Sequence, residues 1–229
     1  MTMPDYKDSG ISIQVGLSGY SFKVESDGVS IKSDWKNAAE IFTTKEFQRT
    51  YSRVELSVFT PKCALVPADF HTPDRSYQML SELVELVEDD TVDFIDVPQY
   101  SAVLVYSNTI GETLSKVISE TVRTSSGDRP IPLPEQYFML RQLAALEDFN
   151  KILASYMDGY LYLAVAQGNT LLLCNSFEAP DFTTAEYFIF MVLKKLQLNP
   201  EVSVINFRTP LSQEQELSLY RYFRSVEQL

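Results

Sequence analysis

Histidine and cysteine are scarce in this chain of 229 residues, which holds one histidine and two cysteines. A single histidine, His71, excludes metal sites built from several histidines and argues against a catalytic triad that needs a histidine base. We interpret it as an ordinary loop residue. Cys63 and Cys174 form no C-x-x-C pair, so we interpret them as structural thiols in a reducing compartment.

Positive charge is also in short supply, because 19 Lys and Arg residues face 31 Asp and Glu residues and give a formal net charge of −12. Nucleic acids and anionic membranes both need a cationic surface, so we expect neither as a partner. No stretch approaches the roughly 18 apolar residues of a membrane-spanning helix. The polar N-terminus lacks a signal-peptide core. These absences predict a cytoplasmic protein.

The apolar content is 45%, which is enough for packed cores. The chain also contains an internal repeat. Residues 11–35 recur in pattern as residues 151–175. The two copies match at their turn residues, Gly19-Tyr20 with Gly159-Tyr160 and Gly28 with Gly168. Alternating apolar residues between these turns predict a three-stranded meander used twice, and hence a two-lobed molecule.

Alternation and helical spacing predict the remaining elements. Further strands are expected at 53–59, 92–97, 102–106 and 202–207, and residues 63–67 form a short apolar run that a proline ends. Helices are expected at 74–87, 114–122 and 135–146. Others are expected to begin near Asn37, near Thr183 and at Ser212, the last running to about 225. Capping-box pairs are expected at Asn37/Glu40, Thr183/Glu186 and Ser212/Gln215. The apolar run at 187–193 predicts a helix buried on both sides, with Tyr187, Phe188 and Phe190 in the core.

A meander, a helix and another strand, occurring twice, resemble the actin-like ATPase superfamily of paired ribonuclease-H-like lobes. Four short motifs stand at residues 17–22 (LSGYSF), 64–70 (ALVPADF), 173–177 (LCNSF) and 181–182 (DF). In these motifs the chain more closely resembles a bacterial family, the domain of unknown function 3822, which is similar to actin-like ATPases in fold. This resemblance spans roughly residues 11–223.

The resemblance implies an α/β fold with mixed sheets and duplicated ribonuclease-H-like lobes. The first lobe would cover 1–148, with an insertion at about 60–125, and the second would cover 149–229. An actin-like second lobe usually continues with another strand and helix. The resemblance therefore also implies a curtailed second lobe, which a partner chain could complete by strand addition.

In actin-like ATPases the first hairpin of each lobe carries an Asp-x-Gly motif, whose carboxylates hold Mg²⁺ and whose turn offers N–H groups to phosphate. The corresponding triplets here begin with Leu17 and Met157, which cannot ligate Mg²⁺. We expect both side chains to be buried or to line an apolar cleft. The third nucleotide-binding turn would fall at 206–208, where there is no glycine. The resemblance thus implies a degenerate nucleotide site with no catalytic residue, metal or cofactor.

The leading hypothesis is a non-catalytic actin-like module that acts as an interaction or scaffold protein for an unidentified protein partner. Its candidate inter-lobe cleft comprises Gly19, Tyr20, Lys23, Asp158, Gly159 and Tyr160. The alternative is an enzyme that binds or hydrolyses ATP with displaced metal ligands, using Asp158 together with Asp27 or Asp34. An acidic cluster is interpreted as a solvated face rather than a cation site: Glu82, Glu85, Glu88, Asp89, Asp90, Asp93 and Asp96.

Overall fold

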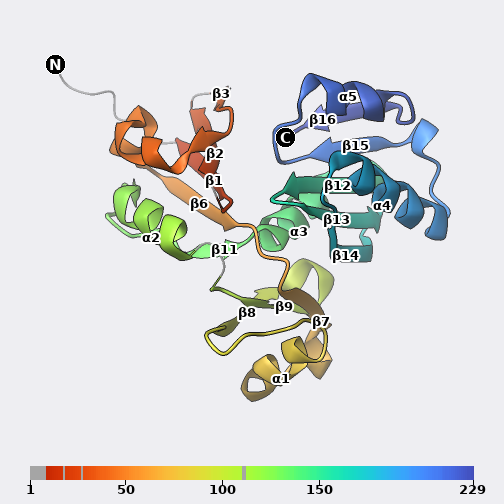
Figure 1. Cartoon of the computed structure of the whole chain (residues 1–229), viewed down its shortest axis with the longest axis horizontal. Helices are drawn as coiled ribbons and strands as arrows, with labels where there is room; N and C mark the ends of the chain where they lie inside the picture. The colour runs from red at the N-terminus through yellow and green to blue at the C-terminus, as the bar shows by residue number, and fades with distance from the viewer. Residues whose placement is uncertain (1–8, 18, 27, 110–111) are drawn as a thin grey trace. The chain divides into compact units, whose positions relative to one another are not determined.

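The computed structural model describes residues 9–17, 19–26, 28–109 and 112–229, with the backbone alone at 112 and 113. The chain forms two compact units (Figure 1). One unit consists of Met1–Thr60 and Asn108–Glu135, and the other of Pro61–Ser107 and Gln136–Leu229. The segment 61–107, which interrupts the first unit in sequence, therefore groups with the C-terminal part of the chain.

The first unit is built on a mixed sheet whose strands follow the order β11-β6-β1-β2-β3, with a short β4 also paired to β2. These strands are β1 Gly10–Val15, β2 Gly19–Ser26, β3 Val29–Lys32, β4 Lys36–Asn37, β6 Arg53–Val58 and β11 Pro132–Pro134. The meander β1-β2-β3 is antiparallel, as the alternation predicts, and β6 and β11 run parallel to β1. Ile11, Ile13 and Val15 all point into the core.

Helices and short strands close the core of this unit. They are the 3₁₀ helices η1 Ala38–Thr43 and η2 Lys45–Gln48, the helix α2 Glu112–Thr121, and the paired strands β5 Thr50–Tyr51 and β10 Arg123–Thr124. The predicted capping box of η1 is confirmed, because Asn37 Oδ1 accepts from Ala39 N–H at 3.0 Å and Glu40 Oε1 accepts from Asn37 N–H at 3.1 Å. Ile41, Phe47 and Ile118 fill the space over the sheet.

The second unit contains a five-stranded sheet in the order β14-β13-β12-β15-β16, which repeats the order and directions of the first sheet. Its strands are β12 Asn150–Met157, β13 Tyr160–Gln167, β14 Thr170–Glu178, β15 Val204–Phe207 and β16 Ser225–Gln228. Its helices are α3 Glu135–Ala145, α4 Phe182–Lys195, η6 Pro200–Val202 and α5 Gln213–Tyr220. The expected continuation of α5 to 225 is wrong, because the chain turns after Tyr220 and pairs β16 with β15. The capping box Ser212/Gln215 is confirmed.

Helix α4 differs from its prediction at both its start and its surface. Asp181, and not Thr183, is the N-cap, since its carboxylate accepts from Thr184 N–H at 2.7 Å. The helix is buried on one side only, at Ala185, Ile189, Val192 and Leu193. Tyr187 is 63% exposed and not a core residue, because α4 has the sheet on one face. Phe188 and Phe190 are half-buried against that core.

Residues 61–107 add a three-stranded antiparallel sheet, β7-β9-β8, to the second unit. It contains β7 Cys63–Pro67, the 3₁₀ helices η3 Ala68–Phe70, η4 Pro73–Arg75 and η5 Pro98–Tyr100, α1 Ser76–Ser81, β8 Val92–Val97 and β9 Ala102–Ser107. One sheet face packs on Leu80 of α1, and the other packs on α3 and β14 around Leu104 and Leu140. The helix expected at 74–87 is shorter, ending at Ser81, and Leu83 and Val87 are exposed. None of the helices in the described part of the chain is both long and apolar enough to cross a bilayer.

Candidate functional site

The turn between β1 and β2 is the first place where the resemblance puts a nucleotide site. Val15 pairs with Tyr20, and Gly16 N–H donates to the Gly19 carbonyl at 3.0 Å. Leu17 lies in the turn and is 66% exposed, so the expectation that it is buried is wrong. The physical reason is that β1 ends at Val15, so Leu17 stands beyond the pleat that directs side chains into the core. Ser18 lies outside the described residues.

Gly19 is needed for a close approach of two backbones. A Cβ at this position would lie 2.1 Å from the Lys36 carbonyl oxygen and 2.8 Å from Nε1 of Trp35. Strand β4 brings these residues there by pairing Asn37 with Gly19 and Lys36 with Tyr20. The chain's own segment therefore covers the side of the first turn toward which a Cβ at Gly19 would point.

Tyr20 and Lys23 have structural partners within the first unit. Tyr20 is fully buried, packs on Phe47 with ring centroids 5.0 Å apart, and shares a 2.5 Å hydrogen bond with the Thr44 hydroxyl. Burial raises the pKa of Tyr20, outweighing the opposite effect of the Thr44 hydrogen bond. Lys23 Nζ pairs with Glu25 at 2.8 Å. Tyr20 is therefore a core residue, and Lys23 belongs to a surface ion pair.

The turn between β12 and β13 has a different construction. Asp158 and Gly159 have φ values of 52° and 76°, and Met157 pairs with Tyr160. Two residues with positive φ between paired strands make a type I′ hairpin, for which Asp-Gly is a preferred sequence. Gly159 is thus required for its backbone conformation, whereas Gly19 is required for space. Both glycines occupy the first turn of their meander, as predicted, since Tyr20 and Tyr160 each pair with the last residue of the preceding strand, but the two turns differ in length and backbone conformation.

Met157 is half-buried at the end of β12, and Asp158 sits in the turn. The Gly159 carbonyl accepts from Ala179 N–H at 2.7 Å, and the Tyr156 hydroxyl donates to the Ala179 carbonyl at 3.0 Å. These two hydrogen bonds tie the second hairpin to the segment after β14.

The third expected nucleotide element, residues 206–208, is occupied by packing residues. Asn206 is buried and donates to the Ile152 carbonyl at 3.3 Å, and Phe207 is fully buried. The Arg208 guanidinium donates to the Gln142 amide oxygen at 2.5 Å and lies 5.8 Å from the ring centre of Phe138. Each side chain has a contact within the second unit that holds it in place.

A buried carboxylate in the first unit went unpredicted. Glu135 has no exposed surface and accepts from Gln14 Nε2 at 2.8 Å and from the Ser57 hydroxyl. The Ser21 hydroxyl in turn donates to the Gln14 amide oxygen at 3.4 Å. The network joins β1, β2 and β6 to the first residue of α3, which directly follows β11. The one sequence signal was a pair of polar residues, Gln14 and Ser57, alternating with apolar residues on strands that are buried on both faces.

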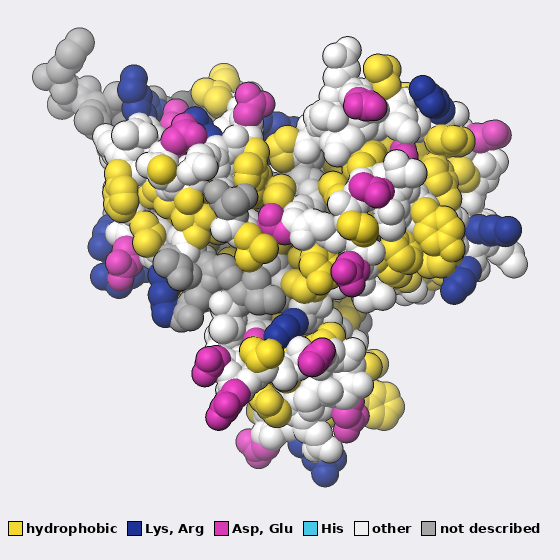
Figure 2. Space-filling model, in the orientation of Figure 1, with side chains coloured by type: hydrophobic (Ala, Val, Ile, Leu, Met, Phe, Trp, Pro, Cys, Tyr) yellow, Lys and Arg dark blue, Asp and Glu magenta, His cyan; other side chains and the backbone are white. Residues whose placement is uncertain are grey.

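The remaining titratable candidates have ordinary surroundings. His71 Nε2 lies 3.0 Å from the Ser76 hydroxyl, and its ring lies 4.7 Å from that of Phe94. Asp34 is exposed, and Asp27 lies outside the described residues. Over the described ranges, no group of three or more His, Cys, Asp or Glu side chains is placed to hold a metal ion. Acidic side chains are spread over the β7–β9 insertion rather than gathered at one point (Figure 2).

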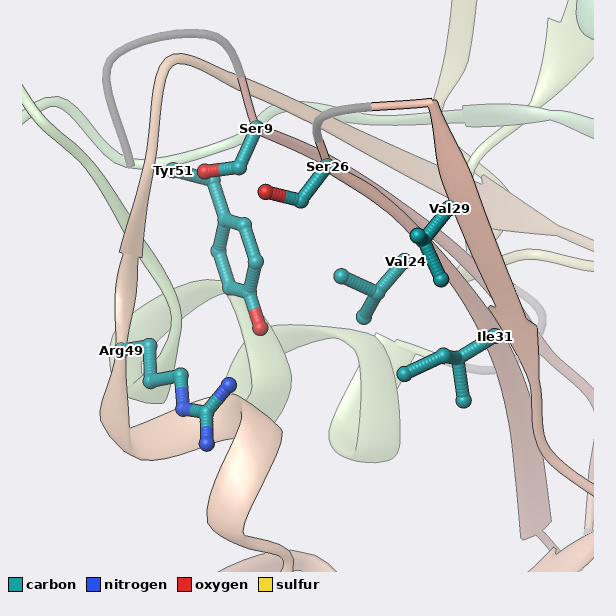
Figure 3. A pocket seen from close by; sticks show the side chains of 7 residues that line it. All are labelled: Ser9, Val24, Ser26, Val29, Ile31, Arg49 and Tyr51. Carbon is teal, nitrogen blue, oxygen red and sulfur yellow. The ribbon is translucent and has the colours of Figure 1, made fainter. Parts of the chain in front are cut away.

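A cavity of about 250 Å³ lies in the first unit beside β3 (Figure 3). Its lining combines an apolar wall with three hydroxyl groups and one guanidinium: Ser9, Val24, Ser26, Val29, Ile31, Arg49 and Tyr51. The Tyr51 hydroxyl donates to the Glu46 carbonyl at 2.9 Å. This cavity was not predicted, because its wall comes from three strands and an intervening loop.

The family model of DUF3822, proteins of unknown function, matches residues 9–226. The chain belongs to this family. It is similar over 100% of its length to a protein of unknown function with an actin-like ATPase fold from Bacteroides thetaiotaomicron, at 18% identity, 94% coverage of that chain and a TM-score of 0.67. The predicted fold, a mixed α/β protein of the actin-like ATPase type, is confirmed.

Two more distant structures are similar at lower scores. One is the PilM–PilN type IV pilus biogenesis complex, at 12% identity, covering 96% of this chain and 88% of that one, with a TM-score of 0.49. The other is the cytoplasmic domain of EpsL of Vibrio cholerae, at 11% identity, 90% and 83% coverage and a TM-score of 0.44. No curated protein matches the chain significantly.

Proposed function

We propose that this protein is a non-catalytic actin-like module that works by binding another protein in the cytoplasm. The observation that carries the proposal is the packing at Gly19. Trp35 and Lys36 stand within 3 Å of where a Cβ would be, at the turn that offers its backbone to phosphate in the enzymes of this fold. In this proposal the two similar sheets descend from one duplicated lobe, and the nucleotide site of the ancestor has degenerated.

The second hairpin supports the same proposal. An Asp-Gly pair with positive φ at both residues is the ordinary solution for a two-residue hairpin, so the presence of Asp158 has a sufficient conformational reason. Arg208 and Asn206 at the third position are engaged in hydrogen bonds with Gln142 and Ile152. Each of these residues thus has a structural role that requires no bound ligand.

The alternative function is that of an ATP-binding or ATP-hydrolysing enzyme with displaced ligands. Glu135 is the observation that favours it, since a fully buried carboxylate at the end of a parallel strand is a group that active sites use. Gln14 and Ser57 already donate to its two oxygens, and this is the arrangement expected of a carboxylate that joins strands. We therefore rank the enzyme second.

Calorimetric titration with ATP and Mg²⁺ separates the two functions. We expect no saturable binding, whereas a dissociation constant below about 100 μM, roughly −5.5 kcal/mol, would support the enzyme. Asp158→Asn is the matched variant, because Asn also tolerates positive φ but carries no charge. We expect it to leave stability unchanged, while Gly159→Val should cost roughly 1–3 kcal/mol through backbone strain. An ATP affinity that collapses in Asp158→Asn with unchanged unfolding would assign the metal role to Asp158.

A further inference from the structure

Strand β3 is an open edge of the first sheet. It pairs with β2 alone among the described strands, and all four of its residues are exposed. The pairing with β2 sets which backbone groups face outward. Ser33 N–H donates to the Phe22 carbonyl at 2.9 Å, and antiparallel pairs alternate, so the backbone groups of Val29 and Ile31 also face β2. The N–H and C=O groups of Ser30 and Lys32 therefore point away from the sheet.

One face of this edge is apolar and borders the cavity. Val29 and Ile31 are 60% and 57% exposed, and both side chains point into the cavity together with Val24 (Figure 3). Binding sites for drug-sized ligands usually enclose about 300–1,000 Å³. At about 250 Å³ the cavity lies below that range. An open edge beside a small apolar pocket is the arrangement in which a bound strand gains main-chain hydrogen bonds and places alternate side chains in pockets.

The other face of β3 carries Lys32 and, on β2, an ion pair between Lys23 and Glu25 at 2.8 Å. Lys32 lies directly opposite Lys23 in the β2–β3 register. Burial and the charge of Lys23 both lower the pKa of Lys32. Like charges in a cross-strand pair repel each other, and a carboxylate beside Lys32 would add to the charge compensation that Glu25 gives Lys23. Arg49 supplies a further positive charge at the cavity.

We propose that β3 binds an extended segment of a partner protein by strand addition, and that this segment alternates apolar and acidic residues. Its apolar side chains would enter the cavity beside Val29 and Ile31, and its carboxylates would lie beside Lys32 on the opposite face. This proposal rests on the protein-binding function proposed above and names the surface and the chemistry of the partner.

Fluorescence anisotropy of the full chain with a fluorescein-labelled eight-residue peptide of alternating Val and Glu tests it. We expect saturable binding below 1 mM, and at least tenfold weaker binding of peptides in which Lys replaces Glu or Ser replaces Val. Ser30→Pro removes an outward N–H that β2 does not use, which edge strands tolerate. It should weaken binding at least tenfold, and Ser30→Ala should leave it within twofold.

If Ser30→Pro fails to fold, Ile31→Ser serves in its place with the same expected loss, since Ile31 is largely exposed. Equal affinity for the Glu and Lys peptides, no saturation below 1 mM, or full binding by both variants would overturn the proposal. A concentration-dependent dimer in sedimentation that Ser30→Pro abolishes would instead assign the edge to a second copy of the chain. The ATP titration decides the proposed function independently, so the two failures are distinguishable.

Discussion

Asp90 holds its negative charge in a closed site within the β7–β9 insertion. Its side chain is 1% exposed and accepts from Lys62 Nζ at 2.5 Å, the Ser107 hydroxyl at 2.6 Å and Val87 N–H at 2.7 Å. Burial alone would raise the pKa of Asp90, but these three hydrogen bonds outweigh it and lower the pKa to about 2. Asp90 therefore differs from a solvated acidic residue, which was its predicted role, because it fastens the loop after α1 to the ends of β7 and β9.

The stability that Asp90 contributes should depend on pH. Its folded pKa lies below the ordinary value of 3.8, so the contribution is complete above about pH 4 and is lost as the pH falls toward 2. Lowering the pKa of Asp90 from 3.8 to about 2 corresponds to roughly 2–3 kcal/mol of folding free energy. Urea unfolding of the wild type and Asp90→Asn between pH 2 and 6 measures this contribution to the free energy of unfolding. The variant should lack the loss of stability that the wild type shows as the pH falls toward 2. Asp96→Asn, at an exposed position, is the control. An identical pH profile for the wild type and Asp90→Asn would contradict the assignment.

At the scale of elements, the start of α4 shows how a local motif and a tertiary contact compete. Thr183 and Glu186 satisfy the capping-box pattern, yet Asp181 caps the helix. Phe182, the first helical residue, packs edge-on against Tyr156 with ring centroids 5.5 Å apart. This contact with β12 anchors the start of the helix before Thr183.

We expect Asp181→Ala to lower the thermal unfolding midpoint and Thr183→Ala to leave it nearly unchanged. The reason is that the Asp181 carboxylate satisfies Thr184 N–H, a bond that also lowers the pKa of Asp181. Circular dichroism melts of the two variants in the same buffer make the comparison. A larger loss for Thr183→Ala would restore Thr183 as the cap.

At the scale of the whole molecule, the chain leaves its first compact unit at residue 60 and returns to it at 108. The intervening sheet is fixed to the second unit by a cluster that contains Leu104, Leu140 and Leu171. The Ser176 hydroxyl adds a 3.2 Å hydrogen bond to the Pro61 carbonyl. The segment thus belongs structurally with residues that follow it by 36 positions, as from Leu104 to Leu140, to 115 positions, as from Pro61 to Ser176.

Leu140→Ala tests this grouping. Leu140 is fully buried where the insertion meets α3 and β14, so removing it should cost roughly 2–5 kcal/mol and speed proteolysis within 61–107. Leu217→Ala is the control, because Leu217 is 57% exposed and should change stability by about 0.5 kcal/mol or less. Equal losses for the two variants, with unchanged cleavage of the insertion, would count against the cluster as the link.

Local patterns were enough to predict both meanders and the capping boxes at Asn37 and Ser212, and the resemblance to a known family implied the actin-like fold. Alternation and turn chemistry act between neighbours, so the residues that produce them lie within one stretch of sequence. They were not enough for Gly19 and Gly159, which look alike in sequence. One glycine admits the backbone of Lys36, and the other adopts positive φ.

Only the tertiary structure decided the features that depend on distant residues. Gln14 and Glu135 are 121 positions apart, and no local pattern predicts that they share a hydrogen bond. Leu17 is exposed because β1 ends at Val15, and Val87 N–H donates to Asp90 instead of extending α1. The sequence by itself determined most of the strands and helices, because each buries a periodic apolar face, but not where α1 and α5 end. Packing across the whole chain decided which faces meet, because the hydrophobic effect is non-directional and does not specify which apolar face an element packs against.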